Sequence, residues 1–233
     1  MSQFSALGAS PVGLRDPRGR GRQRRRGPQA FGFALLGIGL IVVAVVCVQM
    51  LRGAVARDRA RSDWMKVMKS SPFSTSIASL RLTRVAAGAP VVRIIIPAIR
   101  LDEVVVEGLS DKDLWAGPGH LPGTVFPGQR GNSVISAHRD RHFHRLDDLR
   151  IGDVIETQTP ELAVRWRIFQ RRVVGQEVHA IFETGTPMLT LTTCWPTRYV
   201  GPAPDRLLLT AEPVSMRERE TGPRAVEPGK VTH

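Results

Sequence analysis

The chain is poor in cysteine, because its 233 residues include only Cys47 and Cys194. Cys47 lies inside a long apolar run, where a thiol behaves as a small hydrophobic side chain. The chain beyond this run therefore has one thiol and no cysteine with which to pair it. An unpaired cysteine in an oxidising compartment is a liability unless it is used. Cys194 is consequently a candidate reactive thiol, and a buried, inert cysteine is the alternative.

Acidic side chains are also scarce, with 21 Asp and Glu against 33 Lys and Arg and a formal charge of +12. Residues 1–63 carry +8 of this charge, so residues 64–233 are only mildly basic. The arginine run at residues 15–26 has no interleaved aromatics, and its Gly and Pro residues oppose a groove-binding helix. We therefore predict no nucleic-acid partner. No acidic cluster stands out, so the sequence predicts no cofactor and gives no indication of a calcium effect.

Residues 31–51 contain no charged side chain. As a helix, this run would span about 31 Å, which matches a hydrocarbon core of about 30 Å. A helix in a soluble core would show a polar face, and this run has none. The run is also longer than the apolar region of a typical signal peptide, so we predict an uncleaved transmembrane signal anchor. Ala54–Ala56 resembles a cleavage site and leaves cleavage as the alternative.

Basic residues flank the apolar run unequally. Six arginines precede it within residues 18–26, and the five basic residues that follow are spread over residues 52–66. The denser flank stays in the cytoplasm under the positive-inside rule. We therefore predict a single-pass protein of the cell membrane with a cytoplasmic N-terminus and an extracytoplasmic domain.

The rest of the chain is dominated by short β-branched runs that Gly, Pro and Asp separate, with little helical periodicity. Val164, Trp166 and Ile168 alternate with two arginines, as in a half-buried strand. This pattern predicts an all-β antiparallel barrel or sandwich with short helical turns, preceded by one transmembrane helix. We expect five parts in chain order: a basic arm (1–30), an anchor (31–51), a stalk or linker (52–90), a β-domain (91–213) and a flexible tail (214–233).

Three of the six histidines lie close together, at His138, His142 and His144. With Asp140 they would share one face if the strand continued through them, and zinc hydrolases use such close-set histidines. However, the charged residues after His138 indicate a loop, so the shared face is lost. We predict no metal site here and place His142 and His144 in a solvated loop. His120, in a Gly-Pro-Gly turn, is a candidate for either a groove wall or packing.

Cys194 and His138 each end a predicted strand. Pro196 cannot continue the ladder, so the sulfur is expected at a rim. Two strand ends can bring an imidazole and a thiol to one edge, where an imidazolium can stabilise a thiolate and protonate a leaving amine. Arg206 opens the next strand and could return to the same rim. A donor aimed at a developing oxyanion can lower a barrier by about 3–4 kcal/mol.

These residues carry a family resemblance. The stretches "SAHRD", "TLTTCWP" and "PDRLLL" resemble the sortases, membrane-anchored cysteine transpeptidases of bacterial surfaces, and are closest to the class D pattern. The family pattern is a His-Arg pair, a T-L-x-T-C strand end and an Arg in the following strand. This chain matches it at His138-Arg139, Thr190–Cys194 and Arg206. The resemblance implies a closed eight-stranded β-barrel with a site at one edge.

The resemblance also implies a reaction. Cys194 would attack the Thr-Gly carbonyl of an LPxTG-like sorting signal and form a thioester. His138 would act as acid and base, and Arg206 would hold the oxyanion. An amine, from peptidoglycan or a pilin lysine, would resolve the thioester and complete cell-surface anchoring or pilus assembly. The candidate substrate-binding residues are His120, Ala137, Thr193 and Trp195.

Several residues near the matched motifs have other expected roles. Trp195 stands where class D members often have Tyr, a change that affects the groove wall. Arg198 is a weaker rival of Arg206, and Arg139 is expected to be an outward or ion-paired neighbour. The stretch "LPGT" at 121–124 imitates a sorting signal but is expected to form a turn. The alternatives to the sortase interpretation are a non-catalytic membrane-anchored β-domain that binds the cell wall and the zinc hydrolase.

Overall fold

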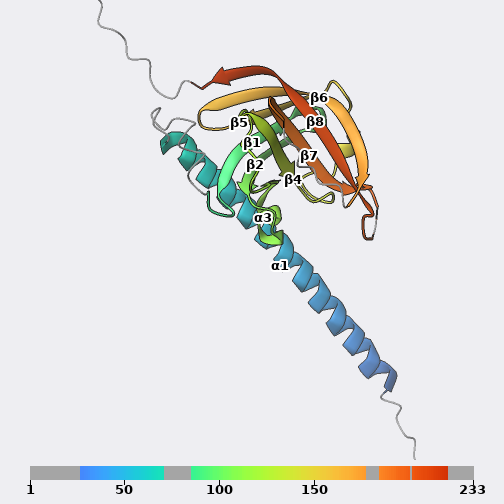
Figure 1. The fold of residues 1–233 in the computed structure, drawn as a ribbon. Coiled ribbons are helices and arrows are strands. Elements are labelled where there is room, and N and C mark those ends of the chain that lie inside the picture. The colour runs from blue at the N-terminus through green and yellow to red at the C-terminus, as the bar shows by residue number, and fades with distance from the viewer. Residues whose placement is uncertain (1–26, 71–84, 177–183, 200, 220–233) are drawn as a thin grey trace, which may run out of the picture. The chain divides into compact units, whose positions relative to one another are not determined.

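A computed structural model describes residues 27–70, 85–176, 184–199 and 201–219 (Figure 1). The chain divides into two compact units, Met1–Cys47 and Val48–His233. All the candidate site residues belong to the second unit. The predicted basic arm lies almost entirely outside the described residues.

The first element is the long helix α1, Gly27–Ser70. Its stretch Gly32–Lys69 includes a window that is long and apolar enough to cross a membrane, by length and composition. The helix does not stop at residue 51, because residues 52–70, expected as part of a stalk, continue it. Within the second unit, Ala60 and Trp64 are 6% exposed and pack against Val104 and Val106.

In the described part of the chain, eight strands close a barrel in the order β1-β2-β3-β4-β7-β8-β6-β5 (Figure 1). The predicted closed eight-stranded barrel is therefore confirmed. Neighbouring strands are antiparallel except for the parallel pairs β2–β3 and β4–β7. The strands are β1 (Pro90–Ile96), β2 (Leu101–Glu107), β3 (Gly119–His120), β4 (Gly131–Ser136), β5 (Val154–Gln158), β6 (Leu162–Gly175), β7 (Pro187–Trp195) and β8 (Asp205–Glu218).

Period-two alternation places one face of each strand in the barrel core. The inward residues of β6 are those predicted, with Trp166 and Ile168 fully buried and Arg165 exposed. The indole Nε1 of Trp166 donates to Thr157 Oγ1 at 2.8 Å, so this buried polar group has a partner. Burying each large apolar side chain contributes about 1.5–3 kcal/mol before the entropy cost.

Short helices complete the domain: α3 (Asp111–Ala116), η1 (Pro97–Ile99) and η2 (Leu146–Asp148). These agree with the short helical turns that the sequence predicts. The helix α3 was not among the predicted elements, although it begins with a capping box between Ser110 and Asp113. Strand β8 also continues past the expected domain end at residue 213 to Glu218.

Candidate active site

Three neighbouring strands end at one rim of the barrel and bring the predicted residues together. In the parallel pair of β4 and β7, Ser136 lies opposite Thr192, and Ala137 N donates to Thr192 O at 3.2 Å. His138 follows two residues after Ser136. If the same register is continued, its position along β4 corresponds to that of Cys194 along β7. In the antiparallel pair of β7 and β8, Cys194 lies opposite Arg206.

Cys194 and Arg206 face away from the barrel core. The inward residues of β7 and β8 next to them, Leu191 and Leu207, are fully buried members of the core cluster. Because side chains alternate along a strand, Cys194 and Arg206 lie on the outer face of the sheet. Both are half-buried, as is His138. The three side chains are therefore partly accessible at the rim of the barrel.

The thiol and the guanidinium are in direct contact, with Arg206 Nη1 donating to Cys194 Sγ at 2.5 Å. Arginine keeps its charge at every relevant pH, so a permanent positive charge lies beside the sulfur. Such a charge stabilises a thiolate and, after attack on a carbonyl, a tetrahedral oxyanion. The geometry suits a nucleophilic cysteine better than an inert one.

Arg139 contributes more than the sequence indicated. Its guanidinium donates to the carbonyl of Pro196 at 2.8 Å and to the carbonyl of Gly201. It also lies 5.8 Å from the ring centroid of Tyr199. Arg139, the residue after His138, therefore contacts the loop between β7 and β8 at two positions, Pro196 and Gly201. The planar fork of arginine suits two carbonyl acceptors, but nothing local in the sequence reveals partners that lie 57 and 62 residues away.

An ion pair also connects the loop between β7 and β8 to the rest of the domain. Arg198 Nη2 donates to Asp148 Oδ1 at 2.7 Å, and Arg145 Nε donates to Asp148 Oδ2 at 3.0 Å. The hydrogen bond from Arg145, and then the charge of Arg198, hold the pKa of the Asp148 carboxyl below its usual value. Arg198 thus points to the η2 segment, and Arg206 is the arginine at the sulfur.

Of the candidate substrate-binding residues, two are enclosed by the strand pair. Thr193 is 1% exposed and donates from Oγ1 to Ala137 O at 2.8 Å. Ala137 is 3% exposed and belongs to the core cluster. Trp195 is half-buried, and the guanidinium of Arg171 lies 5.3 Å from its ring centroid. Of these three, Trp195 is the one whose side chain is open to a ligand.

His120 is buried, with 1% exposure, and both ring nitrogens have partners. Nδ1 lies 2.7 Å from Glu107 Oε2, and Nε2 lies 3.1 Å from both Val125 O and Thr124 Oγ1. This placement favours the packing alternative over a groove wall. Thr124 also donates to Leu121 O at 2.7 Å, which closes the "LPGT" stretch as the expected turn.

The histidine cluster does not form one face. His142, expected in a solvated loop, is 5% exposed, and its Nδ1 lies 3.5 Å from Glu103 Oε1. That expectation was wrong, because β2 supplies a carboxylate that the local sequence does not show. His144 is exposed, as expected, with Nδ1 2.6 Å from Arg141 O. Among the described residues, no group of His, Cys, Asp or Glu side chains is arranged to hold a metal ion.

A closed barrel with a thiol, an imidazole and a guanidinium on three strand ends is the arrangement that the sequence motifs anticipated. A family model of the sortase domain matches residues 94–214, which is about half of the chain. The chain therefore belongs to the sortase family, whose members are cysteine transpeptidases.

Individual relatives agree with this assignment. The chain is 32% identical to Sortase D of Bacillus subtilis (strain 168) over 122 residues, which cover 52% of this chain and 62% of that protein, less than two thirds of its length. The fold is similar to a Clostridium perfringens Sortase D5 transpeptidase, with a TM-score of 0.59, 21% identity, and coverage of 69% and 99% of the two chains. It is also similar to the catalytic domain of B. anthracis SrtD, with a TM-score of 0.50, 26% identity, and coverage of 64% and 100%.

Proposed function

We propose that this chain is a membrane-anchored cysteine transpeptidase that cleaves an LPxTG-like sorting signal between Thr and Gly and transfers the acyl group to an amine. The observation that carries the proposal is the contact of Arg206 Nη1 with Cys194 Sγ at 2.5 Å, with His138 on the adjoining strand end. Membership of the sortase family supports the same chemistry.

In the first step, Cys194 Sγ attacks the carbonyl carbon of the Thr-Gly bond. A C–S bond forms, and the carbonyl oxygen becomes an oxyanion beside the guanidinium of Arg206. His138 accepts the thiol proton and gives it to the departing glycine nitrogen as the C–N bond breaks. The product is a thioester between the threonine carbonyl and Cys194, with a free amine released.

In the second step, an acceptor amine attacks the thioester carbonyl carbon. A C–N bond forms, the C–S bond breaks, and His138 takes the proton that the amine loses. The thiol of Cys194 is restored, so the peptide ends joined to the acceptor by a new amide bond. Candidate acceptors are a peptidoglycan amine and a pilin lysine.

The proposal includes a topology. The helix stretch Gly32–Lys69 includes a window that is apolar enough, in a helix that is long enough, to cross a membrane. Six arginines lie within residues 18–26, on its N-terminal side. We therefore infer a cytoplasmic N-terminus and an extracytoplasmic barrel. The only thiol beyond the apolar run is then Cys194, and it faces an oxidising compartment.

The test is intact-mass spectrometry of the full chain in detergent, incubated with a library of LPxTG-type peptides without added amine. We expect a mass increase equal to the acyl fragment ending in threonine, located on Cys194 by peptide mapping. The Cys194→Ala variant should show no adduct. A folded chain with a free thiol and no adduct from any peptide would overturn the proposal in favour of a binding domain.

A further inference from the structure

The part of α1 that follows the apolar run packs against the barrel. Ala60 and Trp64 contact Val104 and Val106 on β2, and all four side chains are buried. Gly53 is buried too: a Cβ there would lie 3.1 Å from Trp115 Cε3 and 3.2 Å from Arg141 Nη1.

Gly53 is a close-approach position. Glycine is unfavourable in a helix interior, so its place in this one calls for a packing reason. The indole of Trp115 supplies that reason, because it lies directly against the helix and carries the guanidinium of Arg141 at 3.4 Å from its ring centroid. The helix thereby reaches the loop that begins at His138.

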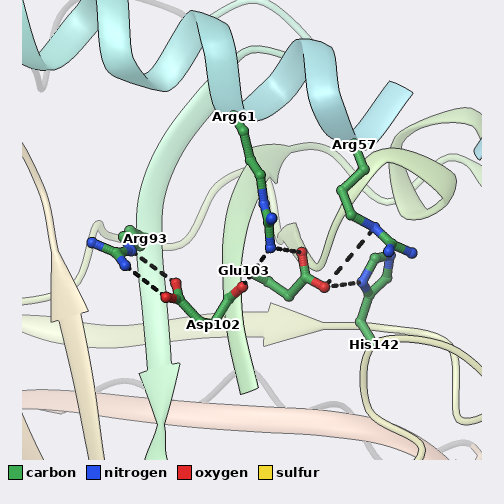
Figure 2. Close-up of polar contacts among 6 residues, drawn as sticks. All are labelled: Arg57, Arg61, Arg93, Asp102, Glu103 and His142. Atoms are coloured by element: carbon green, nitrogen blue, oxygen red, sulfur yellow. Dashed lines mark hydrogen bonds and ion pairs between the residues drawn. The ribbon is translucent and has the colours of Figure 1, made fainter. Parts of the chain in front are cut away.

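Glu103 on β2 is the centre of the polar contacts between helix and loop (Figure 2). Its carboxylate oxygens lie 3.9 Å from Arg57 Nε, 3.8 Å from Arg61 Nη2 and 3.5 Å from His142 Nδ1. The first two groups belong to α1 and the third to the loop after His138. One carboxylate therefore joins the helix to the loop.

The ring of His142 lies beside this carboxylate, with Nδ1 3.5 Å from Glu103 Oε1. Its side chain is 1% exposed, and its Nε2 is buried with no hydrogen-bond partner among the described residues. The backbone on either side of His142 holds the catalytic residue, because Arg141 N and Phe143 N donate to His138 O at 3.3 and 3.2 Å. Phe143, fully buried in the core, fixes the far end of this turn.

We propose that Glu103 and His142 are positioning residues that couple docking of α1 to the placement of His138. The proposal rests on the proposed function, since it concerns the same site. When the helix is packed on the barrel, Arg57 and Arg61 offset the negative charge of the Glu103 carboxylate. This carboxylate in turn holds the ring of His142, and with it the turn from residue 138 to residue 143. Without the helix, Glu103 loses the two arginines that lie 3.9 and 3.8 Å from its carboxylate. The helix is on this view part of the catalytic domain as well as its anchor.

The test uses the full chain in lipid nanodiscs and compares Glu103→Gln and Arg57→Gln with the control Arg59→Gln. Arg59 is exposed on the same helix. We expect kcat to fall about three- to tenfold in the first two variants with KM within about twofold, because small displacements of a catalytic group are costly. Hydrogen exchange of the Arg141 and Phe143 amides should quicken in the same two variants. Arg59→Gln should match the wild type in both measurements.

Two further comparisons separate positioning from general destabilisation. His142→Gln keeps a donor toward Glu103 and should retain more kcat than His142→Leu at equal melting temperature. Gly53→Leu, which forces the helix away from Trp115, should reproduce the defect of Glu103→Gln. Gly39→Leu is its control, because no atom lies within 4 Å of a Cβ built there.

The outcomes distinguish the two proposals. If the wild type forms no adduct with any peptide, the proposed function fails, and hydrogen exchange still decides the coupling. If the wild type turns over peptide while Glu103→Gln and Arg57→Gln match Arg59→Gln in kcat and exchange, the coupling is wrong. Equal losses for His142→Gln and His142→Leu would likewise contradict a positioning role.

Discussion

Removing one hydroxyl should test how strictly the site depends on the pairing of β4 and β7. Thr193 Oγ1 donates to Ala137 O at 2.8 Å, between two residues that are 1% and 3% exposed. Thr193→Val keeps the side-chain shape and deletes the donor. A buried hydrogen bond contributes about 0.5–1.5 kcal/mol net, and a carbonyl deprived of its donor costs about 1–3 kcal/mol. We expect the free energy of unfolding to fall by about 1–2 kcal/mol, which lowers Tm by about 2–8 °C.

The same substitution should also lower the activity. The bond joins the residue before His138 to the residue before Cys194, so its loss lets the two strand ends shift against each other. Since misplacement by about 1 Å can cost 10²-fold in rate, we expect kcat/KM to fall about tenfold at a temperature where both proteins are fully folded. Thr190→Val is the matched control, because it removes another buried hydroxyl bond between β7 and β4, from Thr190 Oγ1 to Asn132 Oδ1 at 2.8 Å, away from the rim. A Thr193→Val protein with wild-type Tm and kcat/KM would refute the reasoning.

Three more variants probe charged side chains, two at the site and one between β1 and β2. Arg206→Ala should lower kcat by about 10²–10³ in the peptide-cleavage assay, since it removes the oxyanion donor, whereas activity within threefold of wild type would exclude that role. Arg139→Gln removes two donors to the loop between β7 and β8 and should raise KM several-fold, measured by initial rates; an unchanged KM would contradict the link. Hydrogen bonds from Arg93 hold the pKa of Asp102 below its usual value, so Asp102→Asn should lower stability at pH 7 by at most about 1 kcal/mol, since the pair is exposed (Figure 2). That difference in Tm should vanish as the pH falls below about 4, and a constant difference would count against the ion pair.

The proposed catalytic residues could be selected from the sequence because each one is marked locally. His138, Cys194 and Arg206 lie at strand ends, where β-branched runs meet Pro, charge or a turn. When the three strands are neighbours in the barrel, as β4, β7 and β8 are, these strand ends lie together at one rim. The closed eight-stranded barrel was implied by the family resemblance, and the all-β class by the alternation of apolar residues, whereas the order of the strands was not predicted.

The error at His142 has a non-local cause. Its neighbours are charged, so the segment was interpreted as solvated, and the burial of this ring depends on Glu103, which lies on a strand some forty residues earlier. The partners of Arg139 are equally remote in the sequence. Pairings between distant polar residues leave no periodic signal, so single-sequence reasoning cannot find them.

The helix after the apolar run did leave a signal. Gly53, Arg57, Ala60 and Trp64 recur at spacings of four, three and four residues, which is one face of a helix. Because frequent charges surround them, this face was interpreted as a polar stalk. A soluble fragment beginning at Ser62 would lack Gly53, Arg57 and Ala60, and with them most of the surface that packs on β2 and near the loop of His138. The catalytic unit is therefore better defined as beginning near Val48, where the second compact unit begins, than at the first strand. Any comparison of truncated and complete chains consequently measures the contribution of α1 to the site as well as the loss of the anchor.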